Sequence, residues 1–235
     1  MDAHLAASAI GATPTARPED TELDPITGDV LVAFTSGSPD QRGGADPEIF
    51  RGPQGEASWT HGWVMRISEL GARSFRWRMA ATGGAPWIGG LGFTNPDNLA
   101  LDAKGNLWLV TDHAGKVSEL FGNNSCWFVP RDSDGDEAAC FATAPMESEL
   151  CGLCFDQQER ALFLSVQHPG ERHGRGRDGQ QEIQVHQLRD RTGQPIEQLR
   201  TVPLGSNWPA QAPGRPPRPG VVVVQRRDGQ PFNGR

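Results

Sequence analysis

Tyrosine is absent from this chain of 235 residues, and lysine occurs only at Lys104 and Lys116. No apolar run approaches the ~18–20 residues of a membrane-spanning helix, so we expect no membrane association of that kind. The formal net charge is −7. Nucleic-acid binding needs clustered basic residues to neutralise phosphates, so this charge makes a nucleic-acid partner unexpected. The first residues, from Met1, show no basic segment followed by a long apolar one, so no signal peptide is predicted.

Glycine and proline are abundant instead, with 29 Gly and 19 Pro. Both residues interrupt helices, which excludes a coiled coil or a helical bundle, and we expect no helix. The 7 Trp and 10 Phe can supply a hydrophobic core. The composition therefore predicts an all-β chain of short strands joined by many turns.

The four cysteines are Cys126, Cys140, Cys151 and Cys154. The last two have the CxxC spacing, but no second CxxC pair and no HxxxH pair follows them. They also lie in an apolar stretch that is typical of a strand. We favour buried structural thiols over a disulfide or a metal-binding knuckle.

Three segments of the chain share one layout: an acidic residue, a short apolar strand, a turn led by Asp and a second apolar strand. The turns begin at Asp24, Asp102 and Asp156, and Asp suits a turn because its side chain bonds its own backbone. The segments are residues 17–35, 95–112 and 148–168. A β-hairpin repeated at irregular intervals favours a β-propeller, with a β-sandwich as the alternative.

Further strands and loops are predicted between and after these hairpins. Two period-two segments, Trp63–Ile67 and Ser74–Met79, indicate outer strands. Residues 182–188 and 221–224 are interpreted as strands in the same way. Long loops are expected near 36–58 and 171–181, followed by a proline-rich connector over 208–219.

An acidic residue precedes the first strand of each hairpin: Glu19, Asp97 and Glu149. In a propeller the first strand of each hairpin usually lies nearest the central channel, so these carboxylates would meet at the channel mouth. Converging carboxylates repel one another unless a cation lies between them, and oxygen ligands suit hard cations. Simple solvated acids are the alternative. His168 ends the third hairpin, and we favour a turn residue there over a channel ligand.

Five sequence motifs resemble those of the bacterial PhoX-type alkaline phosphatase family, in the same order. They are Gly11-Ala-Thr-Pro-Thr-Ala-Arg-Pro-Glu-Asp20, Asn95-Pro-Asp-Asn-Leu-Ala-Leu-Asp102 with Gly105-Asn-Leu-Trp-Leu-Val-Thr-Asp112, Glu149-Leu-Cys-Gly152 followed by Gln167-His-Pro-Gly170, Ser206-Asn-Trp-Pro209, and the segment 218–224. The resemblance implies a β-propeller that hydrolyses phosphomonoesters in the periplasm or outside the cell. It also implies a calcium and iron cluster.

The same resemblance implies a role for each matching residue. Arg17 would bind substrate phosphate through a bidentate contact. Glu19, Asp97 and Glu149 would be metal ligands. Several cations together would neutralise phosphate charge, orient the ester and activate an oxygen nucleophile, so that no protein nucleophile is required.

The chain also departs from the family pattern. We expect residues 1–235 to be the C-terminal portion of a PhoX-like propeller phosphatase domain. The N-terminal part of that family carries the export signal, a thiolate metal ligand and further acidic ligands, which this chain is expected to lack. The propeller would then be incomplete, and we expect weak activity or none from the chain on its own. The preferred phosphoester and the oligomeric state stay open.

Two other functions fit parts of the sequence. A calcium-dependent lactonase of the gluconolactonase-like propellers shares Asn95-Pro-Asp-Asn98 with Gly105-Asn-Leu-Trp108. The lactonase resemblance does not account for Glu149-Leu-Cys-Gly152, for Gln167-His-Pro-Gly170 or for Ser206-Asn-Trp-Pro209. A non-catalytic propeller fragment is the second alternative.

Overall fold

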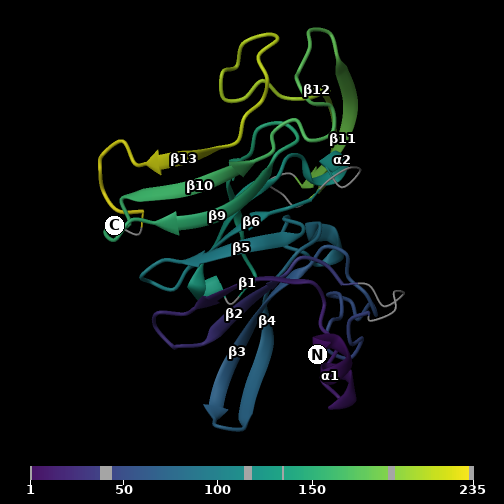
Figure 1. The fold of residues 1–235 in the computed structure, drawn as a ribbon, viewed down its shortest axis with the longest axis vertical. Helices are drawn as coiled ribbons and strands as arrows, with labels where there is room; N and C mark the ends of the chain where they lie inside the picture. The colour runs from purple at the N-terminus through teal and green to yellow at the C-terminus, as the bar shows by residue number, and fades with distance from the viewer. Residues whose placement is uncertain (1, 38–43, 114–117, 134, 190–193, 233–235) are drawn as a thin grey trace.

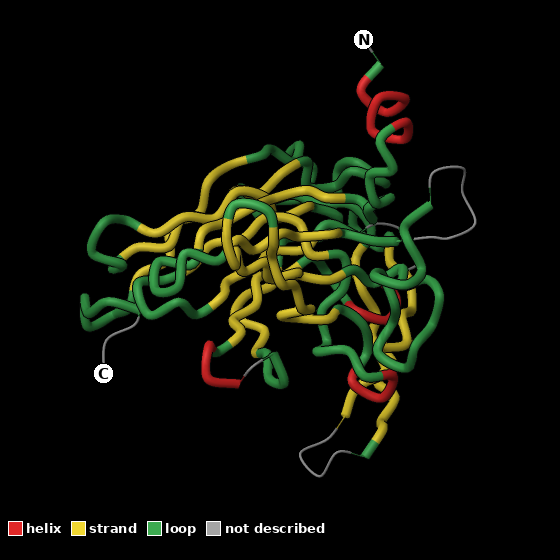
Figure 2. Tube along the Cα trace, turned by 90° about the horizontal axis from the view of Figure 1, so that it is seen from below, coloured by secondary structure: helices red, strands yellow, loops and turns green. Residues whose placement is uncertain are grey.

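The computed structural model describes residues 2–37, 44–113, 118–133, 135–189 and 194–232. Antiparallel strands dominate these residues, and helices are few (Figures 1 and 2). The mostly-β class expected from the composition is confirmed. The elements are α1 (Ala3–Ala9), β1 (Pro18–Leu23), β2 (Val30–Phe34), β3 (Trp63–Gly71), β4 (Ser74–Thr82), η1 (Pro86–Ile88), β5 (Pro96–Leu101), β6 (Leu107–Thr111), α2 (Ser118–Phe121), β7 (Ser125–Val129), η3 (Arg131–Ser133), β8 (Ala139–Thr143), β9 (Glu149–Phe155), β10 (Ala161–Gln167), β11 (Gln181–Arg189), β12 (Pro195–Pro203) and β13 (Gly220–Gln225).

The strands form three successive sheets and one separate hairpin. Two sheets have four strands, in the orders β1-β2-β3-β4 and β5-β6-β7-β8, and the third has the order β9-β10-β13. The three predicted hairpins are the innermost pairs of these sheets, and β3 and β4 are outer strands as expected. The strand predicted over 182–188 is part of β11, but it pairs with β12 in a hairpin of its own. Among the described residues the sheets do not close into a ring.

The three predicted turns are closed by their leading Asp side chains. Asp24 Oδ1 accepts the backbone N–H of Ile26 at 2.8 Å. Asp102 Oδ1 accepts the N–H of Asn106 at 2.9 Å, and Asp156 Oδ1 accepts the N–H of Ala161 at 2.8 Å. A carboxylate that satisfies the donors of its own turn explains why Asp recurs at these positions.

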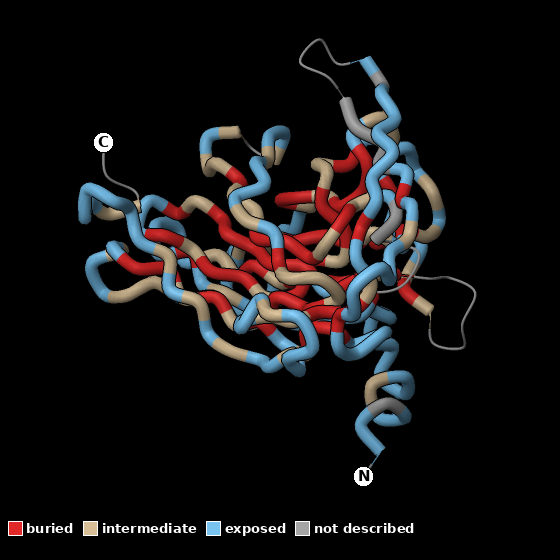
Figure 3. Tube along the Cα trace, turned by 90° about the horizontal axis from the view of Figure 1, so that it is seen from above, coloured by how far each residue is buried: buried red, intermediate tan, exposed pale blue. Residues whose placement is uncertain are grey.

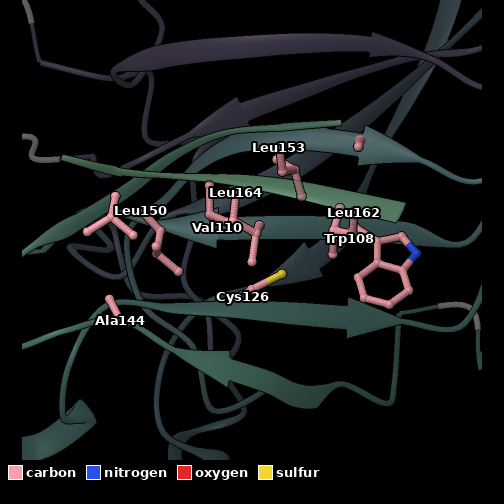
Figure 4. Close-up of a cluster of buried hydrophobic side chains, with 10 residues drawn as sticks. Trp108, Val110, Cys126, Ala144, Leu150, Leu153, Leu162 and Leu164 are labelled. Carbon is pink, nitrogen blue, oxygen red and sulfur yellow. The ribbon is translucent and has the colours of Figure 1, made fainter. Parts of the chain in front are cut away.

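The hydrophobic core lies between the sheets. One cluster fills the space between the second and third sheets and includes Trp108, Val110 and Leu162 (Figure 4). A second cluster, with Leu31 and Leu109, joins the first sheet to the second. Buried segments run through the centre of the molecule, whereas α1 is exposed (Figure 3). The alternating apolar residues of the strands therefore hold neighbouring sheets face to face.

Side chains next to the candidate acids tie the inner strands together. Asp20 on β1 accepts the backbone N–H of Leu99 on β5 at 2.9 Å. Asn98 on β5 accepts the N–H of Gly152 on β9 at 2.8 Å. Strand β1 thus lies against β5, and β5 lies against β9. These bonds fix the relative positions of the three strands that carry the candidate acids.

The expectation that the chain has no helix is wrong. Helix α1 forms in an alanine-rich segment, and Asp2 Oδ1 accepts the N–H of Leu5 at 3.2 Å at its start. The cause is local, because alanine has the highest helix propensity and Asp is a favoured N-cap. None of the helices in the described part of the chain is long and apolar enough to cross a membrane.

The prediction of buried cysteines is correct for only one residue. Cys126 is buried, Cys151 is half-buried, and Cys140 and Cys154 are exposed; all four are free thiols. The prediction failed because the outer strand β8 and one face of β9 are open to solvent, which the apolar sequence around them does not reveal.

The segment expected as a loop over 36–58 has residues 38–43 outside the described part of the chain. Its later part contributes Ala45 and Phe50 to a third apolar cluster, against Trp63. Residues 171–180 consist of turns and short extended stretches, and β11 begins at Gln181.

Candidate functional site

Asp97 lies at the centre of a group of carboxylates where the inner strands begin. Its side chain is on β5, and the residue is only 9% exposed. Burial raises the pKa of Asp97 to about 7, helped by the charges of Glu149, Glu19 and Asp112 and by a hydrogen bond to Glu149. Asp97 therefore lies within electrostatic range of Glu149 and Glu19, the two other acids singled out in the sequence.

Two residues at the end of β10 hold Glu149, which starts β9. Gln167 Nε2 donates to Glu149 Oε2 at 2.8 Å. His168 Nε2 lies 3.0 Å from the same oxygen. The backbone φ of His168 is 34°, so it is a turn residue as expected. The interpretation as a turn residue alone is incomplete, because the ring also contacts the carboxylate.

Arg17 and Glu19 form an ion pair at the start of β1. Arg17 Nη2 lies 3.0 Å from Glu19 Oε1, and the Arg17 side chain is 70% exposed. Arg17 is also near enough to Asp112 for its charge to act on that carboxyl group. An exposed guanidinium at the rim of an acidic group can reach an incoming anion.

Local bulges position two of the acids. The β1–β2 register shifts between Pro18 and Thr21, and the β5–β6 register shifts between Pro96 and Leu99. A bulge bends the strand and re-aims its side chains, and proline at the start of a strand favours such an irregularity. The repeated sequence of Pro, an acidic residue, and Asp or Asn is therefore a local signal for these positions.

Asp112 and Cys151 also lie near these acids, although neither was predicted from the sequence as a site residue. Burial raises the pKa of Asp112, the charge of Glu149 adds to this effect, and His168 opposes it. Burial also raises the pKa of the Cys151 thiol, followed by the charges of Glu149 and Asp97. Gln167 ends β10, and His168 follows it. Asp112 lies at the equivalent position directly after β6, the second strand of the second hairpin. That equivalence was the available sequence signal.

A small polar hollow adjoins the acids. Its volume is about 40 Å³, and its lining includes Asp112, His113, Asn123, Glu149 and His168. Burial lowers the pKa of His113 to about 4, which keeps its ring neutral near pH 7. The hollow has room for ions or a few waters and too little for an organic group.

The acids are suitable ligands for hard cations, but too few of them are grouped closely. Carboxylate oxygens are suitable ligands for calcium and ferric iron, and repulsion within the group would fall if a cation lay among them. Among the residues that the structure describes, no three His, Cys, Asp or Glu side chains are grouped closely enough to hold a metal ion. The roles of Glu19, Asp97 and Glu149 as ligands stay predictions.

Comparison with known proteins gives one family and a related solved structure. The family model described as alkaline phosphatase PhoX matches residues 1–170. The structure of Pseudomonas fluorescens PhoX in complex with vanadate, a transition state analogue, has a TM-score of 0.69 and 25% sequence identity to this chain. The match covers 98% of this chain and 37% of that one, so the chain spans little more than a third of its relative. No curated protein matches significantly. Because the family model covers most of the residues, the chain belongs to the PhoX alkaline phosphatase family.

Proposed function

We propose that this chain is the phosphate-binding portion of a metal-dependent phosphomonoester hydrolase of the PhoX type. The observation that carries the proposal is the convergence of Glu19, Asp97 and Glu149, with Arg17 at their rim. Residues 1–235 would be a C-terminal portion of the phosphatase domain, and their three sheets would be blades of a β-propeller. The succession of antiparallel sheets along the chain, each containing one of the predicted hairpins, supports that architecture.

In this proposal calcium and iron are held at the acids together with further ligands. Bound hard cations supply positive charge that offsets the charge of a phosphate ester. Gln167 and His168 orient Glu149 by their contacts to Oε2, at 2.8 and 3.0 Å. Asp97, whose pKa is about 7, holds a proton in about half of the molecules near neutral pH when no cation is present.

Arg17 is the proposed phosphate-binding residue. Its guanidinium can donate two parallel hydrogen bonds to phosphate oxygens. The 3.0 Å ion pair with Glu19 restrains the side chain beside the acids without burying it. Glu19 would thus be both a metal ligand and a positioning residue for Arg17.

Vanadate binding tests the role of Arg17. Orthovanadate is titrated into the chain in the presence of calcium and iron, and binding is followed by vanadium NMR. Arg17→Gln should weaken binding by about tenfold or more, because a hydrogen bond to a charged group contributes about 1.5–3 kcal/mol. Arg226→Gln is the matched control, since Arg226 is exposed and pairs with Asp228 at 2.7 Å. Equal vanadate affinity in the wild type and Arg17→Gln would contradict the proposal.

Turnover is measured separately, with a chromogenic phosphomonoester and added calcium and iron. The 235-residue chain should show weak activity or none, because no three His, Cys, Asp or Glu side chains in the described part of the chain are grouped closely enough to hold a metal ion. The gene product that carries the remaining ligands should turn over the ester and lose activity in Glu149→Gln. Hydrolysis of a lactone without phosphatase activity would favour the lactonase alternative instead.

A further inference from the structure

A second, larger cavity lies beside the acidic group and has no role in the proposed chemistry. Its volume is about 370 Å³, within the ~300–1,000 Å³ typical of small-molecule pockets. The segment around η1 (Pro86–Ile88), the end of α2 and the facing parts of β7, β8 and β12 enclose it. Its size alone makes it a candidate binding site.

The lining of this cavity is mainly apolar and aromatic. Its lining includes the aromatic residues Trp87, Phe121 and Trp127 and the aliphatic residues Leu91 and Leu120. Trp127 Nε1 donates to Ser125 Oγ at 2.7 Å, so the polar end of that ring is already satisfied. Arg200 is the one charged residue in the described lining. Such a surface favours an uncharged aromatic group over a polar one.

The cavity adjoins the small acid-lined hollow. Asn123 lines both, and its Nδ2 is held by a 2.8 Å hydrogen bond to the carbonyl oxygen of Ala144. The hollow beside Glu149 measures only about 40 Å³, and the apolar cavity measures about 370 Å³. A phosphomonoester has a small charged end and a larger organic end, and the two spaces match these two parts.

One wall of the cavity is connected to the strand that carries Asp97. The Phe121 ring lies 5.2 Å from the His61 ring, centroid to centroid. His61 Nδ1 lies 3.0 Å from Thr94 Oγ1, three residues before Asp97. Burial lowers the pKa of His61, which favours a neutral ring in this contact. The wall is therefore held in a fixed position relative to the acidic group.

We propose that this cavity binds the organic leaving group of the substrate and selects aryl phosphomonoesters. The inference rests on the proposed phosphatase function, since it assumes that the phosphate lies at Arg17 and the acids. Trp87, Phe121 and Trp127 are specificity-determining residues in this proposal, and Asn123 marks the boundary between the two spaces. Phosphate esters of small alcohols would bind through the phosphate alone.

Ligand affinities test the proposal without requiring turnover. Phenyl phosphate, methyl phosphate and neutral phenol are each titrated into the chain with calcium and iron, and the indole N–H signals are followed by NMR. Phenyl phosphate should bind about tenfold or more tightly than methyl phosphate, because its ring is removed from water. Phenol should shift the Trp87 and Trp127 signals, which are assigned with single Trp→Phe variants.

Two variants and a control locate the effect. Leu120→Asp places a charge at the cavity, where Leu120 is 41% exposed, and should bring the ratio of the two ester affinities close to one. Trp87→Leu should lower the same ratio without adding charge. Leu70→Asp is the matched control, at a 58% exposed site on β3, and should leave the ratio unchanged.

The outcomes separate the two proposals. Equal affinity for phenyl and methyl phosphate, with both lost in Arg17→Gln, would overturn the leaving-group site and leave the phosphate site supported. A high ratio that survives both Leu120→Asp and Trp87→Leu would place the ring elsewhere and also overturn it. Binding of phenol with no binding of either ester would contradict the phosphatase function, and the leaving-group assignment with it.

Discussion

Protonation of Asp97 is the main chemical variable at the residue scale. Its carboxyl group is buried against Glu149 and feels the charges of Glu19 and Asp112, and the pKa is raised to about 7. A cation and a proton are alternative ways to relieve that repulsion. His168 and Gln167 contact Glu149 Oε2, and the raised pKa of Asp97 places the change in its charge near neutral pH.

Asp97→Asn should remove the pH dependence of stability that comes from this site. The folded chain keeps a proton on Asp97 up to about pH 7, whereas the unfolded chain loses it near pH 3.8, so metal-free stability falls as pH rises through that window. In chelator at pH 8 the free energy of unfolding of the variant should therefore exceed that of the wild type by on the order of 1 kcal/mol after allowance for solvent screening, and the variant should melt at a higher temperature. At pH 4 the two should melt alike.

Calcium provides the control for this residue. Added calcium at pH 8 should raise the melting temperature of the wild type and have a smaller effect on Asp97→Asn, because ligand binding to the folded state stabilises it. An equal increase in both proteins would show that Asp97 is not a ligand.

At the scale of elements, a single carboxylate links two sheets. Asp24 ends the first hairpin strand and is buried, and it bonds Arg66 on β3 and Arg131 beyond β7, the latter at 2.7 Å. Burial alone would raise the pKa of Asp24. The hydrogen bonds from Arg66, from the Ile26 backbone and from Arg131 outweigh it and hold the pKa well below its usual range. Asp24, which the sequence marked as a turn residue, thus also makes contacts to residues distant in the chain.

Asp24→Asn should destabilise the fold by about 3 kcal/mol, because it removes the buried carboxylate that bonds both Arg66 and Arg131 and leaves Arg66 with Asp29, at 3.1 Å, as its remaining acidic partner. Chemical denaturation measures the change. Asp156→Asn is the matched control: Asp156 closes an equivalent turn through the N–H groups of Arg160 and Ala161, and about 1 kcal/mol is expected there. The extra stability from Asp24 should be present at neutral pH and lost as pH falls below about 4. Equal losses in the two variants would show that the arginine contacts contribute little.

The whole molecule leaves apolar sheet surface uncovered. The third sheet ends at β13, where Val221 is 64% exposed and Val223 51% exposed. The first two sheets each have a fourth strand, and this sheet has three. A Val-rich edge strand without charged residues is a site for pairing with another strand.

We therefore expect the chain to self-associate through β13 as its concentration rises. Light scattering after size exclusion measures the molar mass across a concentration series. Val221→Lys should shift the protein toward monomer, because lysine on an edge strand opposes pairing. Leu70→Lys, at a 58% exposed position on β3, is the control. A monomer at every concentration would contradict the expectation.

The local features of the fold were predictable from the sequence. Asp24, Asp102 and Asp156 mark turns because a carboxylate and its own backbone suffice to make them. The alternating apolar residues of β3 and β4 define strands by a period of two. Helix α1 was equally local and was missed because the glycine and proline content of the whole chain outweighed one short alanine-rich segment.

The candidate site depended on contacts between distant segments. Hairpin spacing indicated Glu19, Asp97 and Glu149, because the acid before each inner strand repeats. Asp112 was missed although it lies in one of those hairpins, since the packing of β5 and β6 against β9 brings it near Glu149. The exposure of Cys154 likewise depends on which face of its sheet is covered by a neighbouring sheet.

The sequence by itself determined the strands, their Asp-closed turns and the three repeated acids, since each depends on a few adjacent residues. The tertiary structure decided which polar groups meet Glu149, which cysteines are buried, and where the apolar cavity around Phe121 and Trp127 lies. Burial, pKa and cavity shape depend on residues far apart in the chain, and no local pattern specifies how those residues pack together.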